Sequence, residues 1–162
     1  MRRRRQSGPI ESNDDGTYTL NLGEYEKEVL TSFTDQLKQL ITGDADDPRV
    51  RRLFPVAYAQ DEEANTEYQR FMREELVASR VAAIDQVSGF LSGHDPITAA
   101  ELSGLMMTIN GLRLVMGTLL DVTDDGAEPE FDDEDDPLAA QWQLYGWLGW
   151  FLEWIVDAQA SD

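Results

Sequence analysis

All four tryptophans of the chain lie within thirteen residues near its C-terminus, in a segment with helical periodicity. Together with the large apolar residues between them, they cover roughly 240° of the helix surface at about 100° per residue. A helix that packs on one core needs an apolar stripe only a little over ~100° wide. The sequence therefore predicts that this helix either is central in a bundle or contributes to a second surface. The set comprises Trp142, Leu144, Tyr145, Trp147, Leu148, Trp150, Phe151, Leu152, Trp154, Ile155 and Val156.

The aromatic composition of this helix favours an interface, because tryptophan is enriched in the hot spots of protein contacts. Trp147, Trp150 and Trp154 are the candidate interface residues. Gly146 and Gly149 lie on the narrower side of the helix and would let a second helix come close. We therefore expect the chain to associate through this helix, as a homodimer.

The charge of the chain limits its partners. Its 162 residues, the length of one ordinary domain, include 32 acidic and 13 basic residues, for a net charge of −19. Removing the four positive charges of Arg2–Arg5 leaves −23 on the remainder. Nucleic acids and anionic membranes repel so acidic a body. The composition thus predicts a soluble acidic protein with weak or no direct DNA binding and no membrane partner.

The chain has no cysteine, so disulfides, thiolate nucleophiles, zinc–cysteine sites and thiol redox sensing are excluded within it. The stretch after Arg2–Arg5 is polar, which does not fit a secretory signal. No segment reaches the ~20 apolar residues of a membrane-spanning helix. These features predict a cytoplasmic protein.

Composition divides the chain into an arm and one domain. Residues 1–15 are predicted to be a disordered basic arm, and residues 16–162 to be a single helical domain. Within that domain, residues 121–136 hold ten acidic residues together with Gly126 and Pro129. Such a stretch is typical of a solvated linker.

Apolar periodicity and helix-end signals predict an all-α fold: a bundle of four main helices with a short N-terminal β-strand and a small extra helix. Capping boxes, glycines and prolines set the expected ends of the helices. Helices are expected at about residues 22–43, 61–91, 98–120 and 137–158, the strand at 18–22 and the small helix at 48–54.

Three charged residues fall inside the apolar faces of these helices: Glu26, Arg80 and Arg113. A desolvated guanidinium requires a paired and hydrogen-bonded partner. The favoured interpretation is a buried ion network with Glu26 as the shared counter-charge, and Asp85 or Asp121 as alternatives. An anion-binding pocket between the two arginines is the competing hypothesis. Glu26 also lies in the first turn of its helix, where the helix dipole favours a carboxylate even when it is exposed.

Catalytic and cofactor signals are weak. His94 is the only histidine and follows Gly93 in a loop, where a helix-end role is favoured over that of a base. One histidine cannot supply the Glu-x-x-His pairs of a di-iron bundle, and the sequence has no G-x-S-x-G motif. Glycine-rich phosphate and dinucleotide motifs are absent from the sequence. We predict a protein that is not an enzyme, with no cofactor and no metal site.

Arg49, Arg51 and Arg52 form the only basic cluster outside the arm and are a candidate basic patch. Such a cluster can contact DNA or an acidic partner. More often such a cluster forms a soluble turn, or it neutralises nearby carboxylates, here the aspartates at positions 44, 46 and 47.

Three sequence blocks carry a resemblance to a known family. They are Arg51–Pro55 with Ala57–Tyr58, then Asn110–Thr118 running into Asp121–Thr123, and finally Tyr145–Leu148. In order and spacing they resemble the actinobacterial oxidative-stress regulator family (AosR), over roughly residues 17–156. The resemblance implies a cytoplasmic, non-enzymatic regulator linked to transcription, acting with a sigma factor or another protein partner.

Redox sensing in that family is associated with a cysteine pair that forms an internal disulfide. This chain has no cysteine, so it is either a constitutive regulator or responds to a different input. Two other functions stay open. One is a homo-oligomeric scaffold or adaptor domain without a promoter role, and the other is direct DNA binding through Arg2–Arg5 and residues 49–52.

Overall fold

The computed structural model describes residues 7–54, 62–93, 96–123, 125 and 128–161. The described part contains four long helices, a two-stranded hairpin and one 3-10 turn, which confirms the predicted all-α class. The elements in chain order are β1 (Ile10–Ser12), β2 (Tyr18–Leu20), α1 (Glu24–Thr42), η1 (Pro48–Val50), α2 (Glu62–Leu91), α3 (Ala99–Leu119) and α4 (Pro137–Ala160).

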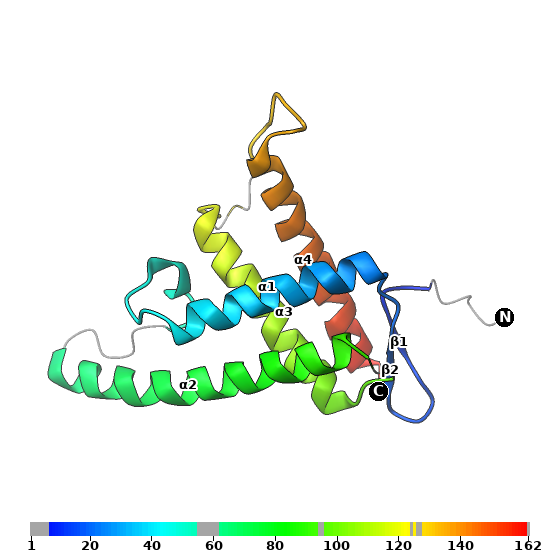
Figure 1. The fold of residues 1–162 in the computed structure, drawn as a ribbon, viewed down its shortest axis with the longest axis horizontal. Helices are drawn as coiled ribbons and strands as arrows, with labels where there is room; N and C mark the ends of the chain where they lie inside the picture. The colour runs from blue at the N-terminus through cyan, green and yellow to red at the C-terminus, as the bar shows by residue number, and fades with distance from the viewer. Residues whose placement is uncertain (1–6, 55–61, 94–95, 124, 126–127, 162) are drawn as a thin grey trace.

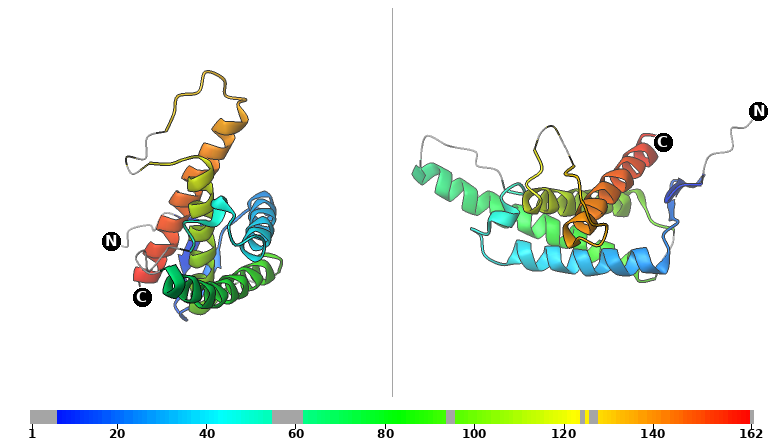
Figure 2. Two further views of the ribbon diagram at one scale, coloured as in Figure 1. Left: turned by 90° about the vertical axis from the view of Figure 1, so that its left-hand side faces the viewer. Right: turned by 90° about the horizontal axis from the view of Figure 1, so that it is seen from above.

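α3 is the central helix. α1 and α2 run antiparallel to each other across it, and α4 runs antiparallel to α3 along another side (Figure 1; Figure 2). Leu102, Leu105 and Ile109 of α3 are completely buried. Among the described residues, α3 alone has the length and apolar content of a membrane-spanning helix. It has this composition as the core of the bundle, in contact with α1, α2 and α4.

Local side-chain signals fix the helix ends. Thr98 and Glu101 form the expected capping box of α3: the Glu101 amide donates to Thr98 Oγ1 at 3.2 Å, and the Thr98 amide donates to Glu101 Oε2 at 2.8 Å. α4 begins with Pro137, and the Leu138 amide donates to Oδ1 of Asp136 at 2.9 Å. These caps explain why the sequence located both helix starts.

The N-terminal hairpin corrects the prediction for the arm. Residues 10–12 belong to β1, which pairs antiparallel with β2 in the register Ile10–Leu20. Ile10 is only 4% exposed, because β1 packs against α4. Tyr18 forms a further bridge with Ile97, just before α3. Residues 1–6, including Arg2–Arg5, lie outside the described residues.

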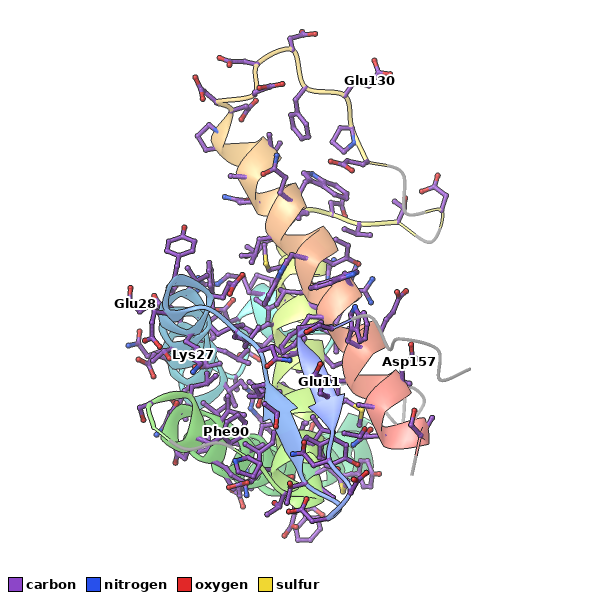
Figure 3. All side chains as sticks on the ribbon, turned by 90° about the vertical axis from the view of Figure 1, so that its right-hand side faces the viewer. Glu11, Lys27, Glu28, Phe90, Glu130 and Asp157 are labelled. Atoms are coloured by element: carbon purple, nitrogen blue, oxygen red, sulfur yellow. The ribbon has the colours of Figure 1, made fainter. Side chains whose placement is uncertain are left out.

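The acidic linker between α3 and α4 projects away from the helices, with Glu130 near its tip (Figure 3). Its described residues are mostly exposed. At its start, the Val122 carbonyl accepts a hydrogen bond from Arg52 Nη2 at 3.1 Å. Asp136 closes the linker as the cap of α4.

Candidate protein-interaction surface

α4 turns one face into the core and another toward solvent. Leu148, Phe151 and Ile155 are at most 1% exposed and belong to the main core. Trp150 and Val156, by contrast, are 46% and 48% exposed. The helical bundle therefore buries only part of the wide apolar arc, and the rest faces solvent.

Trp147, Trp150 and Trp154 form a row of rings along the outer side of α4, which we call the tryptophan ladder. Ring centroids are 6.5 Å apart between Trp147 and Trp150, and 6.2 Å apart between Trp150 and Trp154. Trp147 also stacks on the buried ring of Phe151 at 5.1 Å. Ring pairs at these distances attract each other, so the ladder is anchored to the core. The fourth tryptophan, Trp142, is buried.

The ladder forms one wall of an open groove of about 490 Å³, the tryptophan groove. The opposite wall comes from the segment that leads into the hairpin. A Cβ on Gly8 would lie only 2.4 Å from the Trp154 ring, so glycine allows this segment to lie directly on the indole. Asn21 holds the segment, with its side chain donating to the Gly8 carbonyl at 3.0 Å and its amide to the Pro9 carbonyl at 2.8 Å. The described lining residues are Ser7, Gly8, Pro9, Asn21, Leu22, Glu26, Trp147, Trp150 and Trp154.

Sequence reasoning identified the ladder but missed the opposite wall. The sequence assigns residues 7–9 to a disordered arm, because a Ser-Gly-Pro segment has no apolar pattern of its own. The contact between Gly8 and Trp154 joins residues far apart in the chain, and no local signal announces it.

Acidic side chains lie in the groove and beside it. Glu26 is exposed and is the one charged side chain among the described residues that line it. Glu153 and Asp157 are exposed on α4, each three residues after a ladder tryptophan, which puts them beside those rings on the helix surface. Asp157 lies on the outer side of α4, and Glu11 lies on the neighbouring strand (Figure 3).

Arg113 faces α4 rather than a carboxylate partner. Its guanidinium carbon lies over the Tyr145 ring, 4.9 Å from the centroid. A Cβ at Gly149 would lie 3.1 Å from Arg113 Nε, so glycine makes room for the guanidinium against the helix. Nε is buried without a hydrogen-bond partner. The side chain borders a shallow cleft that Glu153 and Asp157 also line.

Arg80 lies on a different side of α3. Its Nη1 would be 3.5 Å from a Cβ at Gly111, a position that also contacts Leu37 and Leu53. The side chain is half-buried, and its Nε has no partner. Burial lowers the pKa of the Arg80 guanidinium, because desolvation disfavours the charged form.

The predicted ion network of Glu26, Arg80 and Arg113 is therefore not formed. Glu26 accepts a hydrogen bond from the Gly23 amide and caps α1, while the two arginines lie beside separate glycines of α3 and α4. The alternative of an anion held between both arginines fails for the same reason. The pattern of apolar positions placed both arginines inward, but it could not show that a glycine of the adjacent helix leaves space for each guanidinium. Asp85, an alternative counter-charge, pairs with Lys38 at 2.7 Å.

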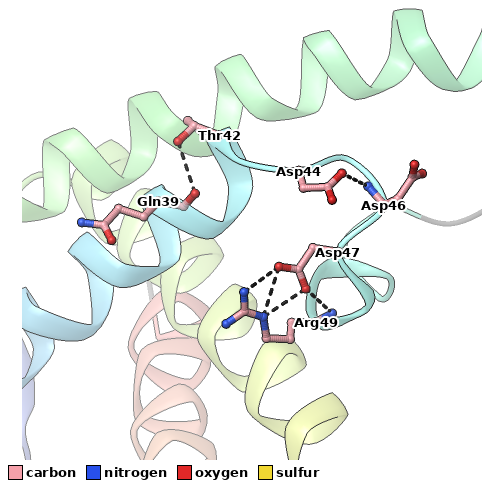
Figure 4. Close-up of polar contacts among 6 residues, drawn as sticks. All are labelled: Gln39, Thr42, Asp44, Asp46, Asp47 and Arg49. Atoms are coloured by element: carbon pink, nitrogen blue, oxygen red, sulfur yellow. Dashed lines mark hydrogen bonds and ion pairs between the residues drawn. The ribbon is translucent and has the colours of Figure 1, made fainter.

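The basic cluster is largely engaged in local structure. Arg49 forms an ion pair with Asp47 at 2.6 Å (Figure 4), as in the neutralising alternative. This pairing lowers the pKa of Asp47 and raises that of Arg49. Arg52 bonds the Val122 carbonyl. Arg51 is exposed and borders a cavity of about 250 Å³ beside Phe54.

Gly117 of α3 joins the three sequence blocks of the resemblance. A Cβ there would lie 2.7 Å from Arg52 Nη1 and 3.7 Å from the Tyr145 ring. Tyr145 in turn carries Arg113 on its face. Arg52, Gly117 and Tyr145, one residue from each block, therefore pack together and link the segment after η1 to α3 and α4.

A family model described as a domain of unknown function (DUF2017) matches residues 3–159. This chain belongs to that family. The family-level regulatory role is supported by curated relatives: proteins named oxidative stress regulator AosR from Mycobacterium tuberculosis and Mycobacterium bovis are each 30% identical over 149 residues. The alignments cover 78% of this chain and 67% of each relative. The resemblance found in the sequence is thereby confirmed.

A further relative from Mycobacterium leprae is 26% identical over 129 residues, covering 70% of this chain and 58% of that protein. The chain thus spans between 58% and 67% of the length of these relatives. No solved structure gives a significant match. Within the described residues, no group of three acidic or histidine side chains gathers as metal ligands would, and His94 lies outside those residues.

Proposed function

We propose that this protein is a cytoplasmic, non-enzymatic regulator linked to transcription under oxidative stress, and that it acts by binding a protein partner through the tryptophan groove. The observation that carries the proposal is Trp150, a large aromatic residue left 46% exposed in an open groove. A sigma factor or another transcription component is the partner implied by the resemblance. The names of the mycobacterial relatives support the regulatory role.

The groove suits partner binding because it is formed before the partner arrives. Trp147 stacks on Phe151, and Gly8 lies on Trp154, so both walls are held by the fold itself. A preorganised surface loses little conformational entropy on binding. Rigid aromatic side chains in such a surface supply large contact areas for few rotatable bonds.

The input of this regulator is not its own thiol chemistry, because the chain has no cysteine. The regulator is therefore either constitutive or responds to a different input. This separates it from any mechanism that depends on an internal disulfide.

A homo-oligomeric scaffold or adaptor is the second candidate function. Gly146 favours it, because a Cβ there would meet nothing within 4 Å and a second helix could approach. Charge opposes it, since two copies with −19 each repel one another unless the contact is large.

Site-specific photo-crosslinking separates these functions. A photoreactive residue at position 150 is compared with one at Phe71, which is 62% exposed on α2. We expect position 150, and not position 71, to crosslink an RNA polymerase subunit or a sigma factor in living cells. Crosslinks from position 150 only to further copies of the chain would favour the scaffold. Equal crosslinking from both positions would contradict a binding role for the groove.

A further inference from the structure

The tryptophan groove combines exposed aromatic faces with negative charge, and this combination selects a particular kind of partner. Glu26 lines the groove with the ladder. Glu153 and Asp157 come three residues after Trp150 and Trp154 on α4 and line the neighbouring cleft, which Arg113 also borders. None of the described residues that line the groove is basic. A lysine or arginine side chain placed over an indole face gains a cation–π contact, and nearby carboxylates strengthen it.

The groove also has an apolar floor of suitable size. Its volume of about 490 Å³ falls within the range of roughly 300–1,000 Å³ that is common for binding pockets. Leu22, which is partly exposed, adds aliphatic surface next to the indoles. An occupant that carries only charge would leave this surface wet, whereas one with neighbouring apolar side chains would cover it.

Charge complementarity argues against a second copy of this chain as the occupant. The chain carries −19, and Glu26, the one charged residue among the described residues that line the groove, is acidic, so a copy would bring like charges together. A partner with a basic segment gains from the same field. It is attracted at a distance and paired at the groove.

We propose that the tryptophan groove binds a short segment of a partner protein in which lysine or arginine side chains alternate with apolar ones. A cation of this segment lies over Trp150 and near Glu26, and its apolar side chains cover Leu22 and the ladder. This inference rests on the proposed function and specifies the chemistry of the partner.

Fluorescence anisotropy with three labelled peptides tests the proposal. The first peptide alternates lysine and leucine, the second replaces each lysine by glutamate, and the third replaces each leucine by serine. We expect the lysine–leucine peptide to bind at least about tenfold more tightly than either of the others. Its affinity should fall as salt is raised, because exposed charges are screened. Equal binding of the glutamate peptide would overturn the proposal.

Because the whole chain is acidic, matched variants must locate the site. Trp150→Ala and Glu26→Gln should each weaken the lysine–leucine peptide several-fold, while Phe71→Ala and Glu74→Gln on α2 should leave its affinity unchanged. Gln preserves the capping geometry at position 26, and circular dichroism checks the fold of every variant. If the α2 variants weakened the peptide as much as Trp150→Ala and Glu26→Gln, the peptide would be bound by the general charge of the protein. The groove would then not be the binding site.

Two further outcomes would assign the groove to another occupant. A dimer in sedimentation that Trp150→Ala dissociates would mean that a second copy fills it. A large gain in peptide affinity on deleting residues 2–5 that persists at high salt, where general charge is screened, would mean that the arm of the same chain competes for it. If the peptides fail but position 150 still crosslinks a transcription component, the proposed function stands and only the partner chemistry is wrong.

Discussion

The guanidinium of Arg113 lies over the ring of Tyr145, 4.9 Å from its centroid, and this contact ties α3 to α4. It replaces the ion pair that the helical pattern predicted. Because Arg113 Nε has no hydrogen-bond partner, the side chain holds α4 by stacking and packing rather than by charge pairing.

Replacing Arg113 tests this difference. Arg113→Ala should lower the free energy of unfolding by about 1–2 kcal/mol, the cost of a lost cation–π contact and its packing. A pair with a buried carboxylate would give about 3–5 kcal/mol instead. Arg113→Met keeps most of the packing and should cost less than Arg113→Ala. Urea unfolding of the parent protein and of the two Arg113 variants measures these free energies. When Glu26→Gln is combined with either variant, the changes in the free energy of unfolding should add to within about 0.5 kcal/mol.

Gly146 and Gly149 provide a matched comparison within α4. A Cβ at Gly146 meets nothing within 4 Å, so Gly146→Ala should stabilise the protein by about 0.5–1 kcal/mol through helix propensity. A Cβ at Gly149 would lie 3.1 Å from Arg113 Nε, and the guanidinium is confined by Tyr145. Gly149→Ala should therefore stabilise less or destabilise. Equal thermal shifts for the two variants would contradict the close approach of Arg113.

Gly8→Ala tests the wall of the tryptophan groove. The added methyl would overlap the Trp154 ring, which the helix and its neighbouring rings hold in place. We expect a loss of about 1–3 kcal/mol, the usual cost of overpacking, or release of residues 7–9 from the indole. Tryptophan emission should shift to the red in either case, as Trp154 gains contact with water. Gly89→Ala on α2, where a Cβ meets nothing within 4 Å, is the control.

Acid should remove the contribution of Asp47 to stability. In the folded protein its pKa lies below the ordinary value of 3.8, chiefly because the Arg49 side chain donates a hydrogen bond to the carboxylate. A depressed folded pKa gives stability that is complete above the unfolded value and is lost as the pH falls through the folded value. At neutral pH, Asp47→Asn should therefore lower the melting temperature. Below about pH 3.8, the difference in melting temperature between the variant and the parent protein should become smaller. A difference in melting temperature that stays constant from neutral pH to below pH 3.8 would show that protonation of Asp47 does not affect stability.

DNA binding is expected to be weak, salt-sensitive and independent of sequence. The chain without Arg2–Arg5 carries −23, so deleting those arginines should abolish any gel shift seen at low salt. Sequence-specific binding that survives physiological salt would instead support a direct role at promoters.

The sequence predicted those elements whose signals are local. Thr98 with Glu101, and Pro137 after Asp136, mark the starts of α3 and α4, and the structure shows the corresponding cap hydrogen bonds. The amphipathic pattern could not reveal β1, because three residues carry no period. The burial of Ile10 depends on α4, far along the chain.

The candidate site was predicted in part for the same reason. The width of the apolar arc identified Trp147, Trp150 and Trp154 as a surface in excess of what the core needs. The placement of Arg113 depends on a glycine of another helix, and glycine has no side chain to register in an apolar pattern. A pattern of apolar residues therefore cannot predict contacts that depend on the space left by a glycine.

Trp147, which lines the groove, stacks on the fully buried ring of Phe151, so the groove is in direct contact with the hydrophobic core. A ligand that binds only the folded chain raises its stability by mass action. If the proposed partner binds the groove, chains without it should unfold more often and be cleaved faster by proteases, which would shorten their cellular lifetime. The supply of partner would then set how much of this protein persists in the cell, with no change in its synthesis.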